Sequence, residues 1–597
     1  MLVGVGAVLL GAVPAASAAP TTSRERICED LDLDVATRLG GVRLPAGTYD
    51  LTADGITCTR AVMLVEEWAD DREVGGAWDV DVADGDEFTF VREDADGEID
   101  EIDLEPDTST AAALADPRWS MVPMSKDANG DGFIDGDGGV PASGALTRSP
   151  STTFVGEGNR VAQPDERLIG GALSWYLNPN GFPVELNACR SEGDTFAWRI
   201  RSGVRVVKST PNEELDRESC RRTVLLPEGT YSLELTVRAG QGRPGRTERS
   251  VETISADVVN HLVVAFGDSY ASGQGNPRNI DAWLANRTDT PAFTPYWDDL
   301  GCNRSTRGAP AQAALQLENA SPYTSVTLVD VACTGSTAAV GILGPKPSSG
   351  KTISQIEEVR GIIGDRSIDA VTISIGGNDV GVGPAFESCL SALVNCPLKP
   401  STNDPLTGYP TLHAAVQTLI AELPASYAQI AGCLGGSSCI LANGSSIPPL
   451  RLTAGAPVLP TLYQDLTRAA DGSSCRYLTM SPQDFAWARA TIQVPTPQAS
   501  FDYRPAVGPT VSLPITATVN QQVAATSALG WSPVTGTWTS SGDSAVGHGV
   551  CAGDDAWVYG ITTRAGFPEA SLHPNPAGQA ALAAPIAAAL ISRLAPR

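Results

Sequence analysis

The distribution of apolar and polar positions divides the chain into two halves of different texture. Up to about residue 258, short segments alternate apolar and polar residues as half-buried strands do, and Glu87–Val91 is one example. From about residue 259, continuous apolar runs alternate with alanine-rich stretches at helical spacing. Repeated strand–helix units are typical of a parallel sheet covered by helices on both faces. The pattern therefore predicts a β-rich front half and an α/β back half.

Four apolar runs and three alanine-rich stretches define the elements expected in the back half. We predict strands over 262–266, 325–331, 370–375 and 477–480. We predict helices over 311–318, 413–434 and 576–594. Chemistry in such sheets gathers at the carboxyl ends of the strands, so a site is expected among the residues that follow them.

Two small β-rich domains are expected in the front half, an acidic one over 19–150 and a second over 165–258, with the Ser/Thr/Gly-rich stretch 143–160 as linker. They share a Pro-x-Gly turn leading into Thr-Tyr-x-Leu, at 44–52 and 226–236. Because Trp198 accompanies two cysteines, the second domain loosely resembles immunoglobulin-like or PKD-like sandwiches. Both domains are predicted to be spacers or to contact an extracellular surface.

The amino-terminal residues carry the pattern of an export signal. An apolar run over Leu2–Val13 is followed by Ala16-Ser17-Ala18, a small-x-small cleavage site, so residues 1–18 are predicted to be a signal peptide. No later run of about 18 uncharged apolar residues occurs, and no membrane span is predicted. The protein is therefore expected to be secreted.

Cysteine content agrees with an oxidising compartment, because the chain has twelve cysteines, an even number, in clustered positions. Sequence leaves their connectivity open. Pairing of nearest neighbours is the simplest arrangement: Cys28–Cys58, Cys189–Cys220, Cys302–Cys333, Cys389–Cys396, Cys433–Cys439 and Cys475–Cys551. Every bridge then stays inside one domain.

Charge and histidine content argue against several classes of function. The 597 residues include 41 Lys and Arg against 69 Asp and Glu, a formal net charge of −28. Such a surface repels phosphate backbones, which argues against nucleic acid as a partner. With four histidines and neither HExxH nor CxxC, the chain lacks the ligand patterns of a zinc protease, a zinc ribbon or a thioredoxin-type site.

One acidic segment of the first domain matches a calcium-binding loop. Oxygen ligands stand at its positions 1, 3, 5, 7 and 9, namely Asp127, Asn129, Asp131, the backbone carbonyl of Phe133, and Asp135. Position 12 is Gly138, where a bidentate Glu is expected. Two interpretations stay open: a weak structural calcium site remote from any catalytic residue, and a solvated acidic turn.

The strongest chemical signal is Gly267-Asp-Ser269, which directly follows the predicted strand 262–266 and precedes small residues able to open a helix. This arrangement exposes the Ser269 hydroxyl at a strand end, with helix N–H groups nearby for a developing oxyanion. Asp and Ser are also ordinary helix caps. The second copy, Gly542-Asp-Ser544, has no strand before it and is interpreted as a loop.

Three further segments place reactive groups at the same edge. Gly335 follows the strand that ends at Val331, and Asn378 follows the strand over 370–375. An unobstructed backbone N–H and a side-chain amide are what an oxyanion hole requires. His573 lies in the loop before the last predicted helix, where it is free to reach a serine.

These four segments, in this order, resemble the blocks of the SGNH (GDSL-type) ester hydrolases and lipases, with the four name-giving positions at Ser269, Gly335, Asn378 and His573. Segments 302–305, 332–333 and 548–551 resemble the secreted, disulfide-bonded actinobacterial esterase/lipase branch. The resemblance covers about 259–597 and implies a flavodoxin-like three-layer α/β/α catalytic domain there. It implies Ser269 as nucleophile, His573 as general base, and an oxyanion hole formed by Ser269, Gly335 and Asn378.

The group that orients the His573 ring stays open. Many members of the family carry Asp three residues before this histidine, where this chain has Ala570. A backbone carbonyl near Ala570 can hold the imidazole, as in a family branch with Ser-His dyads. Glu569 and the pair Asp554 and Asp555 are carboxylate alternatives.

The expected function is hydrolysis of lipid or small-molecule acyl esters by a secreted lipase or carboxylesterase that needs no cofactor for catalysis. The apolar, proline-containing segment 491–534 is expected to shape an acyl pocket. Two alternatives stay open. One is a carbohydrate acetylesterase, and the other, from a different class, is a calcium-dependent surface-binding protein with an inactive hydrolase domain.

Overall fold

The structure is a computed structural model that describes residues 115–123, 181–215, 219–239, 248–285, 293–392, 395–494, 498–534, 547–561 and 567–594. Between 26 and 106 and at 168–173 it describes only the backbone of the strands. The predicted signal peptide, Cys28 and Cys58, the calcium-loop residues, the linker 143–160 and the second Gly-Asp-Ser lie outside the described residues.

Short antiparallel strands make up the described part of the acidic front region. They are β1 (Arg26–Ile27), β2 (Leu31–Leu33), β3 (Thr37–Leu39), β4 (Val42–Leu44), β5 (Gly47–Asp54), β6 (Asp79–Val82), β7 (Phe88–Glu93) and β8 (Ile99–Pro106). One sheet has the order β1-β5-β8-β7-β6 with β2 also on β5, and β3 pairs with β4. A separate hairpin joins β10 (Leu168–Ile169) and β11 (Ala172–Leu173).

The next unit is a two-sheet sandwich. Its strands are β9 (Arg118–Met121), β12 (Phe182–Asn187), β13 (Thr195–Ser202), β14 (Arg205–Ser209), β15 (Glu213–Glu214), β16 (Arg221–Leu226), β17 (Gly229–Ala239) and the first half of β18 (Glu248–Gly267). One sheet has the order β16-β12-β9 and the other contains β14-β13-β17-β18. Trp198 and Phe196 are buried between them. The predicted range 19–150 for the first domain is too long, because β9 pairs with β12 of the sandwich.

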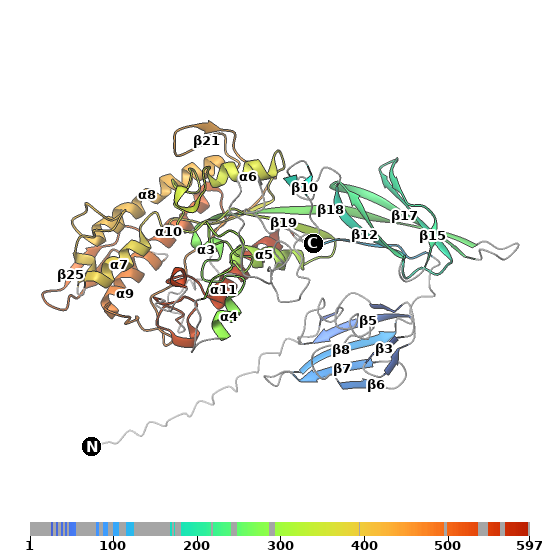
Figure 1. Ribbon diagram of the computed structural model, residues 1–597, viewed down its shortest axis with the longest axis horizontal. Helices are drawn as coiled ribbons and strands as arrows, with labels where there is room; N and C mark the ends of the chain where they lie inside the picture. The colour runs from blue at the N-terminus through green and yellow to red at the C-terminus, as the bar shows by residue number, and fades with distance from the viewer. Residues whose placement is uncertain are drawn as a thin grey trace, which may run out of the picture.

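A single strand, β18, connects the sandwich to the α/β half without a linker (Figure 1). Its first half pairs antiparallel with β17 as far as Val258, and its second half pairs in parallel from Val259 onward. The predicted boundary between 258 and 259 therefore lies inside one strand. The change of texture at this point reflects burial of the strand on both faces, and no break in the backbone accompanies it.

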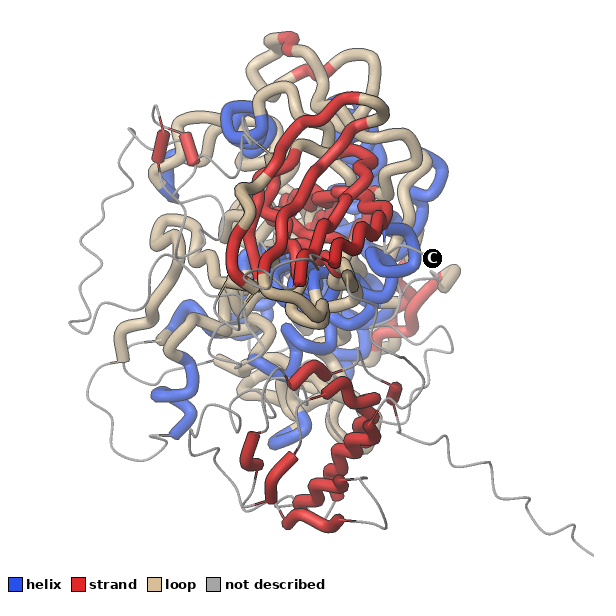
Figure 2. Tube along the Cα trace, turned by 90° about the vertical axis from the view of Figure 1, so that its right-hand side faces the viewer, coloured by secondary structure: helices blue, strands red, loops and turns tan. Residues whose placement is uncertain are grey.

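The parallel part of the sheet has the order β19-β18-β20-β23, with β19 (Thr324–Asp330), β20 (Ala370–Ser374) and β23 (Val458–Pro460). Side chains of β18 alternate between two hydrophobic clusters: Leu262 and Val264 belong to one, Val263 and Ala265 to the other. Helices therefore cover both faces. Figure 2, seen from the sandwich side, shows the strands in front of these helices.

The helices of this half surround the sheet. They are α3 (Ser269–Ser272), α4 (Ile280–Ala285), α5 (Ala309–Glu318), α6 (Gln355–Ile363), α7 (Val382–Ala392), α8 (Leu412–Cys433), α9 (Pro482–Ala488), α10 (Val519–Ala525) and α11 (Pro576–Leu594). Helices α5 and α11 share one hydrophobic cluster, and α6, α8 and α10 contribute to the other. Among the described helices, α11 is the one long and apolar enough to cross a membrane, and it packs Leu582, Ile586 and Leu590 into the core.

One predicted strand is wrong. Residues 477–480 form a turn closed by a bridge between Tyr477 and Met480, in which Leu478 is exposed and has a left-handed φ of +54°. An exposed residue in that conformation cannot continue an extended strand. The fourth parallel strand is instead β23, at Val458–Pro460.

Five disulfides join described cysteines in the pairs that nearest-neighbour spacing predicts: Cys189–Cys220, Cys302–Cys333, Cys389–Cys396, Cys433–Cys439 and Cys475–Cys551. The second of these joins the segment after α4 to the loop after β19. It therefore fixes one of the loops at the carboxyl edge of the sheet, where the candidate site lies.

Candidate active site

Ser269 is the first residue of α3 and is separated from the end of β18 by Asp268 alone. Gly267 permits this sharp transition with a φ of +141°, and a Cβ there would lie only 2.4 Å from the Ser374 carbonyl oxygen. Asp268 is the N-cap of α3, and its Oδ1 accepts a hydrogen bond from the Tyr270 N–H at 3.0 Å. The serine is thereby held at the helix N-terminus with its side chain at the strand end.

The structure brings His573 to Ser269, 304 residues apart in sequence, with Nε2 at 2.8 Å from Oγ. The other ring nitrogen, Nδ1, lies 2.8 Å from the Ser571 carbonyl oxygen. A carbonyl only accepts, so Nδ1 carries the proton and Nε2 presents its lone pair to the serine hydroxyl. This is the tautomer that a general base requires.

A backbone carbonyl near Ala570 holds the ring, but it is the carbonyl of Ser571 and not that of Ala570 itself. The Ala570 oxygen accepts the His573 backbone N–H at 3.0 Å, and the Ser571 carbonyl contacts the ring in its place. The carboxylate alternatives are not used: Asp554 and Asp555 are exposed, and Glu569 contributes its backbone carbonyl to Gln274.

The backbone around His573 is held in an uncommon conformation. Leu572 has a φ of +62°, which costs a non-glycine residue about 1–3 kcal/mol. Its N–H donates to the Tyr559 carbonyl at 3.0 Å, and its own carbonyl accepts from the Tyr270 hydroxyl at 3.1 Å. Tyr270 thus links the helix that carries Ser269 to the loop that carries His573.

Burial determines the protonation state of His573. It lowers the pKa of His573 to about 4, although the carbonyls of Ser571 and Glu569 oppose the shift. The imidazole is therefore neutral at pH 7, ready to accept the proton of Ser269.

The predicted oxyanion-hole residues lie on the two neighbouring loops. The loop after β19 is attached to the end of β18 by a hydrogen bond from the Cys333 N–H to the Gly267 carbonyl at 3.0 Å. In that loop Gly335 is exposed, with a φ of +67°. The Asn378 amide comes from the loop after β20 and donates to the Ser336 carbonyl at 3.0 Å, which fixes the amide beside Gly335.

Gln274 joins three of these segments, and sequence reasoning missed it. Its Nε2 donates to the Glu569 carbonyl at 2.5 Å in the loop of His573. Its Oε1 accepts from the hydroxyl of Thr334, next to Gly335. Its position five residues after Ser269 is the one sequence signal that could have identified it.

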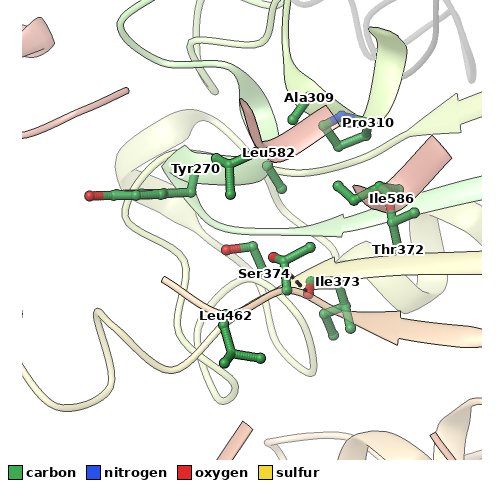
Figure 3. Close-up of a pocket in the computed structure, with 11 residues that line it drawn as sticks. Tyr270, Ala309, Pro310, Thr372, Ile373, Ser374, Leu462, Leu582 and Ile586 are labelled. Atoms are coloured by element: carbon green, nitrogen blue, oxygen red, sulfur yellow. Dashed lines mark hydrogen bonds between the residues drawn. The ribbon is translucent and has the colours of Figure 1, made fainter. Parts of the chain in front are cut away.

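Tyr463 is the second residue that sequence reasoning missed. Its hydroxyl donates to Oδ2 of the buried Asp268 at 2.5 Å and accepts the Gly377 N–H at 2.9 Å. Burial raises the pKa of Asp268 to about 6, and the hydrogen bond from Tyr463 counteracts this shift. The tyrosine thus joins the residue before Ser269 to the residue before Asn378. Figure 3 shows Tyr270 and Ser374 among the residues that line a small cavity in this region.

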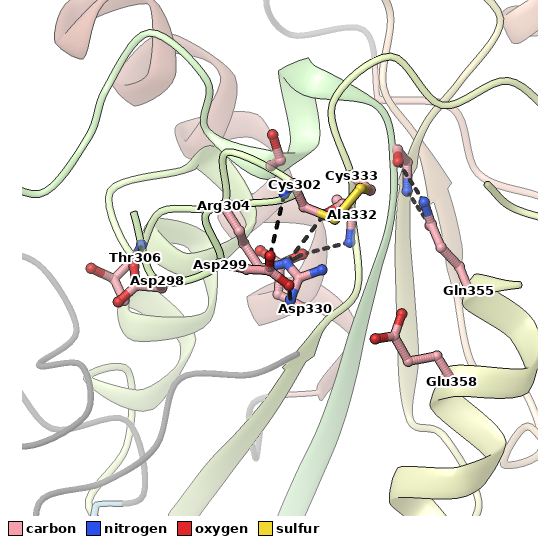
Figure 4. A network of polar contacts seen from close by, with 12 residues as sticks. Asp298, Asp299, Cys302, Arg304, Thr306, Asp330, Ala332, Cys333, Gln355 and Glu358 are labelled. Carbon is pink, nitrogen blue, oxygen red and sulfur yellow. Dashed lines mark hydrogen bonds and ion pairs between the residues drawn. A yellow bond between two sulfur atoms is a disulfide. The ribbon is translucent and has the colours of Figure 1, made fainter. Parts of the chain in front are cut away.

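A buried ionic network supports the loop that carries Gly335 (Figure 4). Arg304 donates to the Ala332 carbonyl at 3.1 Å and lies 3.4 Å from Asp299 and 3.8 Å from Asp330. Burial raises the pKa of Asp330 to about 7, and Arg304 opposes the shift. Together with the Cys302–Cys333 disulfide, this network restrains the loop that carries Gly335.

No group of acidic, cysteine or histidine side chains suited to a metal ion occurs within the described residues. The predicted calcium ligands, Asp127, Asn129, Asp131, Phe133 and Asp135, lie outside them.

Comparison with known proteins does not identify a family. No protein-family model and no curated protein matches the chain. One solved structure, of a carbohydrate esterase whose active site displays divergent catalytic and non-catalytic binding functions, is similar with 11% identity and a TM-score of 0.24. The match covers 70% of this chain and 95% of that chain. Since a TM-score this low supports no inference, function must be argued from the geometry of the site.

The lowered pKa of His573 predicts the acid limb of the pH profile. A His573 that acts as general base must be neutral, so kcat/KM for ester hydrolysis should fall only as the pH drops towards about 4, well below the usual histidine pKa of about 6.5. The profile is measured with a p-nitrophenyl ester. An Asp268→Asn variant removes a second buried titratable group near Ser269. The acid limb of the pH profile should persist in this variant, because it is assigned to His573. A limb at pH 6.5 or above would contradict the assignment.

Replacing Tyr463 with Phe should impair turnover more than substrate binding. The change leaves the Asp268 carboxyl and the Gly377 N–H without their shared partner, and small displacements of reacting groups cost up to about a hundredfold in rate. We expect kcat to fall at least tenfold with little change in KM.

Tyr503→Phe is the matched control, because Tyr503 makes a comparable buried hydrogen bond to Asp484 at 2.7 Å. It should lose a similar amount of thermal stability and keep its kcat. Equal kcat values for the two variants would show that Tyr463 does not position the site.

Proposed function

We propose that the protein is a secreted serine ester hydrolase of the SGNH type that cleaves acyl esters. The observation that supports this most directly is the contact of Ser269 Oγ with His573 Nε2 at 2.8 Å, with Nδ1 held by a backbone carbonyl. The parallel strand order and the helices on both faces agree with the layering of that family. The disulfides agree with export.

The proposed reaction has two steps. In the first, Ser269 Oγ attacks the ester carbonyl as its proton passes to His573 Nε2, and the oxyanion is stabilised by the N–H groups of Ser269 and Gly335 and the amide of Asn378. His573 then protonates the departing alcohol, which leaves an acyl-enzyme. In the second step, water attacks the acyl-enzyme with His573 again as the base, and the carboxylic acid is released.

An apolar cavity lined in part by Leu572 favours acyl chains longer than acetate. It has a volume of about 490 Å³, including its open mouth, and its lining includes Leu572, the residue directly before the base. Side chains of α7 and α9 form much of the wall, with Phe386, Phe485 and Trp487 among them. Ile492 and Gln493, from the segment expected to shape an acyl pocket, also line it. A lipase or carboxylesterase is therefore the preferred function, and a carbohydrate acetylesterase is the alternative.

A fluorophosphonate probe should label wild-type protein at Ser269. Ser269→Ala should prevent labelling and reduce hydrolysis at least about a thousandfold, because the nucleophile is lost. Ser544→Ala, in the second Gly-Asp-Ser, is the matched control and should remain active. Circular dichroism and thermal unfolding check that each variant is folded. Folded wild-type protein that resists the probe would favour the surface-binding alternative.

A series of p-nitrophenyl esters tests the acyl preference. We expect kcat/KM to be higher for medium-chain esters than for acetate. Ala488 lines the cavity, so Ala488→Leu should lower the ratio of medium-chain to acetate activity about tenfold or more.

Ala486→Leu, on the same helix and outside the cavity lining, should leave that ratio unchanged. Activity confined to acetate in the wild type would instead select the carbohydrate acetylesterase.

A further inference from the structure

A lysine side chain lies beside the glycine that we assign to the oxyanion hole. Lys346 is 8% exposed, and its Nζ and Cε lie 3.5 and 3.7 Å from the position that a Cβ on Gly335 would occupy. Gly335 has no side chain and is itself exposed. The ammonium group therefore borders the open face of the loop at which the reacting carbonyl is proposed to bind.

Lys346 has no acidic partner among the residues that the structure describes. Its Nζ donates to the Ser348 hydroxyl at 2.9 Å, which uses one of three N–H groups. Burial lowers its pKa, as expected for an ammonium taken out of water without a counter-charge. Buried charges in proteins are usually paired, so this one is available to a ligand.

The neighbouring Lys351 provides a contrast within the same turn. Its Nζ lies 2.6 Å from Asp299 and 3.3 Å from Glu358, so its charge is balanced inside the protein. The backbones of the two lysines are joined by hydrogen bonds in both directions, at 3.0 and 3.1 Å. The turn thus holds one lysine in the ionic network and directs the other to the exposed glycine.

We propose that Lys346 makes this site selective for esters that carry an anionic group, a carboxylate or a phosphate, a few atoms from the reacting carbonyl. The inference rests on the proposed ester hydrolase function and specifies its substrate class. The two remaining N–H groups of Lys346 donate charge-assisted hydrogen bonds to the anionic oxygens. Such a group belongs either to the acyl chain, as a terminal carboxylate, or to the alcohol, as a phosphate.

The overall charge of the protein makes a local cation necessary for such a substrate. A net charge of −28 provides no long-range attraction for an anion. Recognition must therefore occur at short range, where a partly desolvated ammonium interacts more strongly than an exposed one. Lys346 meets this requirement next to the oxyanion loop.

The experiment compares matched neutral and anionic esters. On the acyl side the pair is p-nitrophenyl butyrate and mono-p-nitrophenyl succinate, which have the same number of acyl carbons. On the alcohol side it is a monoacylglycerol and its 3-phosphate. Lys346→Met should lower kcat/KM at least tenfold for one anionic ester and less than twofold for its neutral counterpart. Lys346→Arg should retain most of the selectivity, and the pair that responds identifies the source of the anion.

Lys208→Met is the control for net charge, because Lys208 is exposed on β14 of the sandwich. It should leave all four activities unchanged. Equal losses of Lys346→Met on neutral and anionic esters would overturn the proposal and indicate a role in oxyanion stabilisation or folding. No loss, or a wild type that cleaves the neutral esters alone, would also overturn it. Failure of the proposed function is distinguished by the absence of hydrolysis of butyrate and of fluorophosphonate labelling.

Discussion

The hydrogen bond between the Ser571 carbonyl and His573 Nδ1 is the constraint on which the site depends. Among the described residues a carbonyl, not a carboxylate, faces Nδ1, so an imidazolium receives no full negative charge from them there, and burial keeps the ring neutral. A backbone carbonyl fixes the tautomer as well as a carboxylate does, but stabilises the protonated ring less. Precise placement of the ring must then compensate. This explains why Leu572 is held in a strained conformation by Tyr270 and Tyr559.

The loops of the site are joined mainly by hydrogen bonds between segments that are distant in the chain. Gln274 connects the helix of the nucleophile to the loops of Gly335 and His573, and Tyr463 connects the nucleophile turn to the loop of Asn378. A buried network of this kind is stabilising only when every member is satisfied. The disulfide Cys302–Cys333 and the ionic network of Arg304 restrain the same loops covalently and electrostatically.

Sequence reasoning found the residues that follow strands and missed those that act across the site. Ser269, Gly335 and Asn378 lie within five residues after apolar strands, whose ends mark the edge of the sheet. Tyr463 follows β23, a three-residue strand ending at Pro460 that carries no strand pattern of its own. The ring contacts the carbonyl of Ser571, and not that of Ala570, because the backbone turns at Leu572. The left-handed φ of that residue cannot be predicted from a leucine side chain. The continuity of β18 was missed because the burial of the strand changes at 258 while its backbone does not.

The same continuity separates the sandwich from the chemistry. Ser269 follows the carboxyl end of β18, whereas the amino-terminal half of β18 belongs to the sandwich. The segment from Val258 to Gly267 alone spans roughly 30 Å, at about 3.3 Å per residue. Contacts between the two units lie at the opposite edge of the sheet: the Met121 N–H donates to the Pro322 carbonyl, and Arg366 covers the ring of Phe182. Because the two units share a strand and pack against each other beside it, the sandwich has little freedom to move towards the site. The sandwich therefore does not reach the site, and the proposed substrate selectivity rests on the apolar cavity and Lys346 of the α/β half.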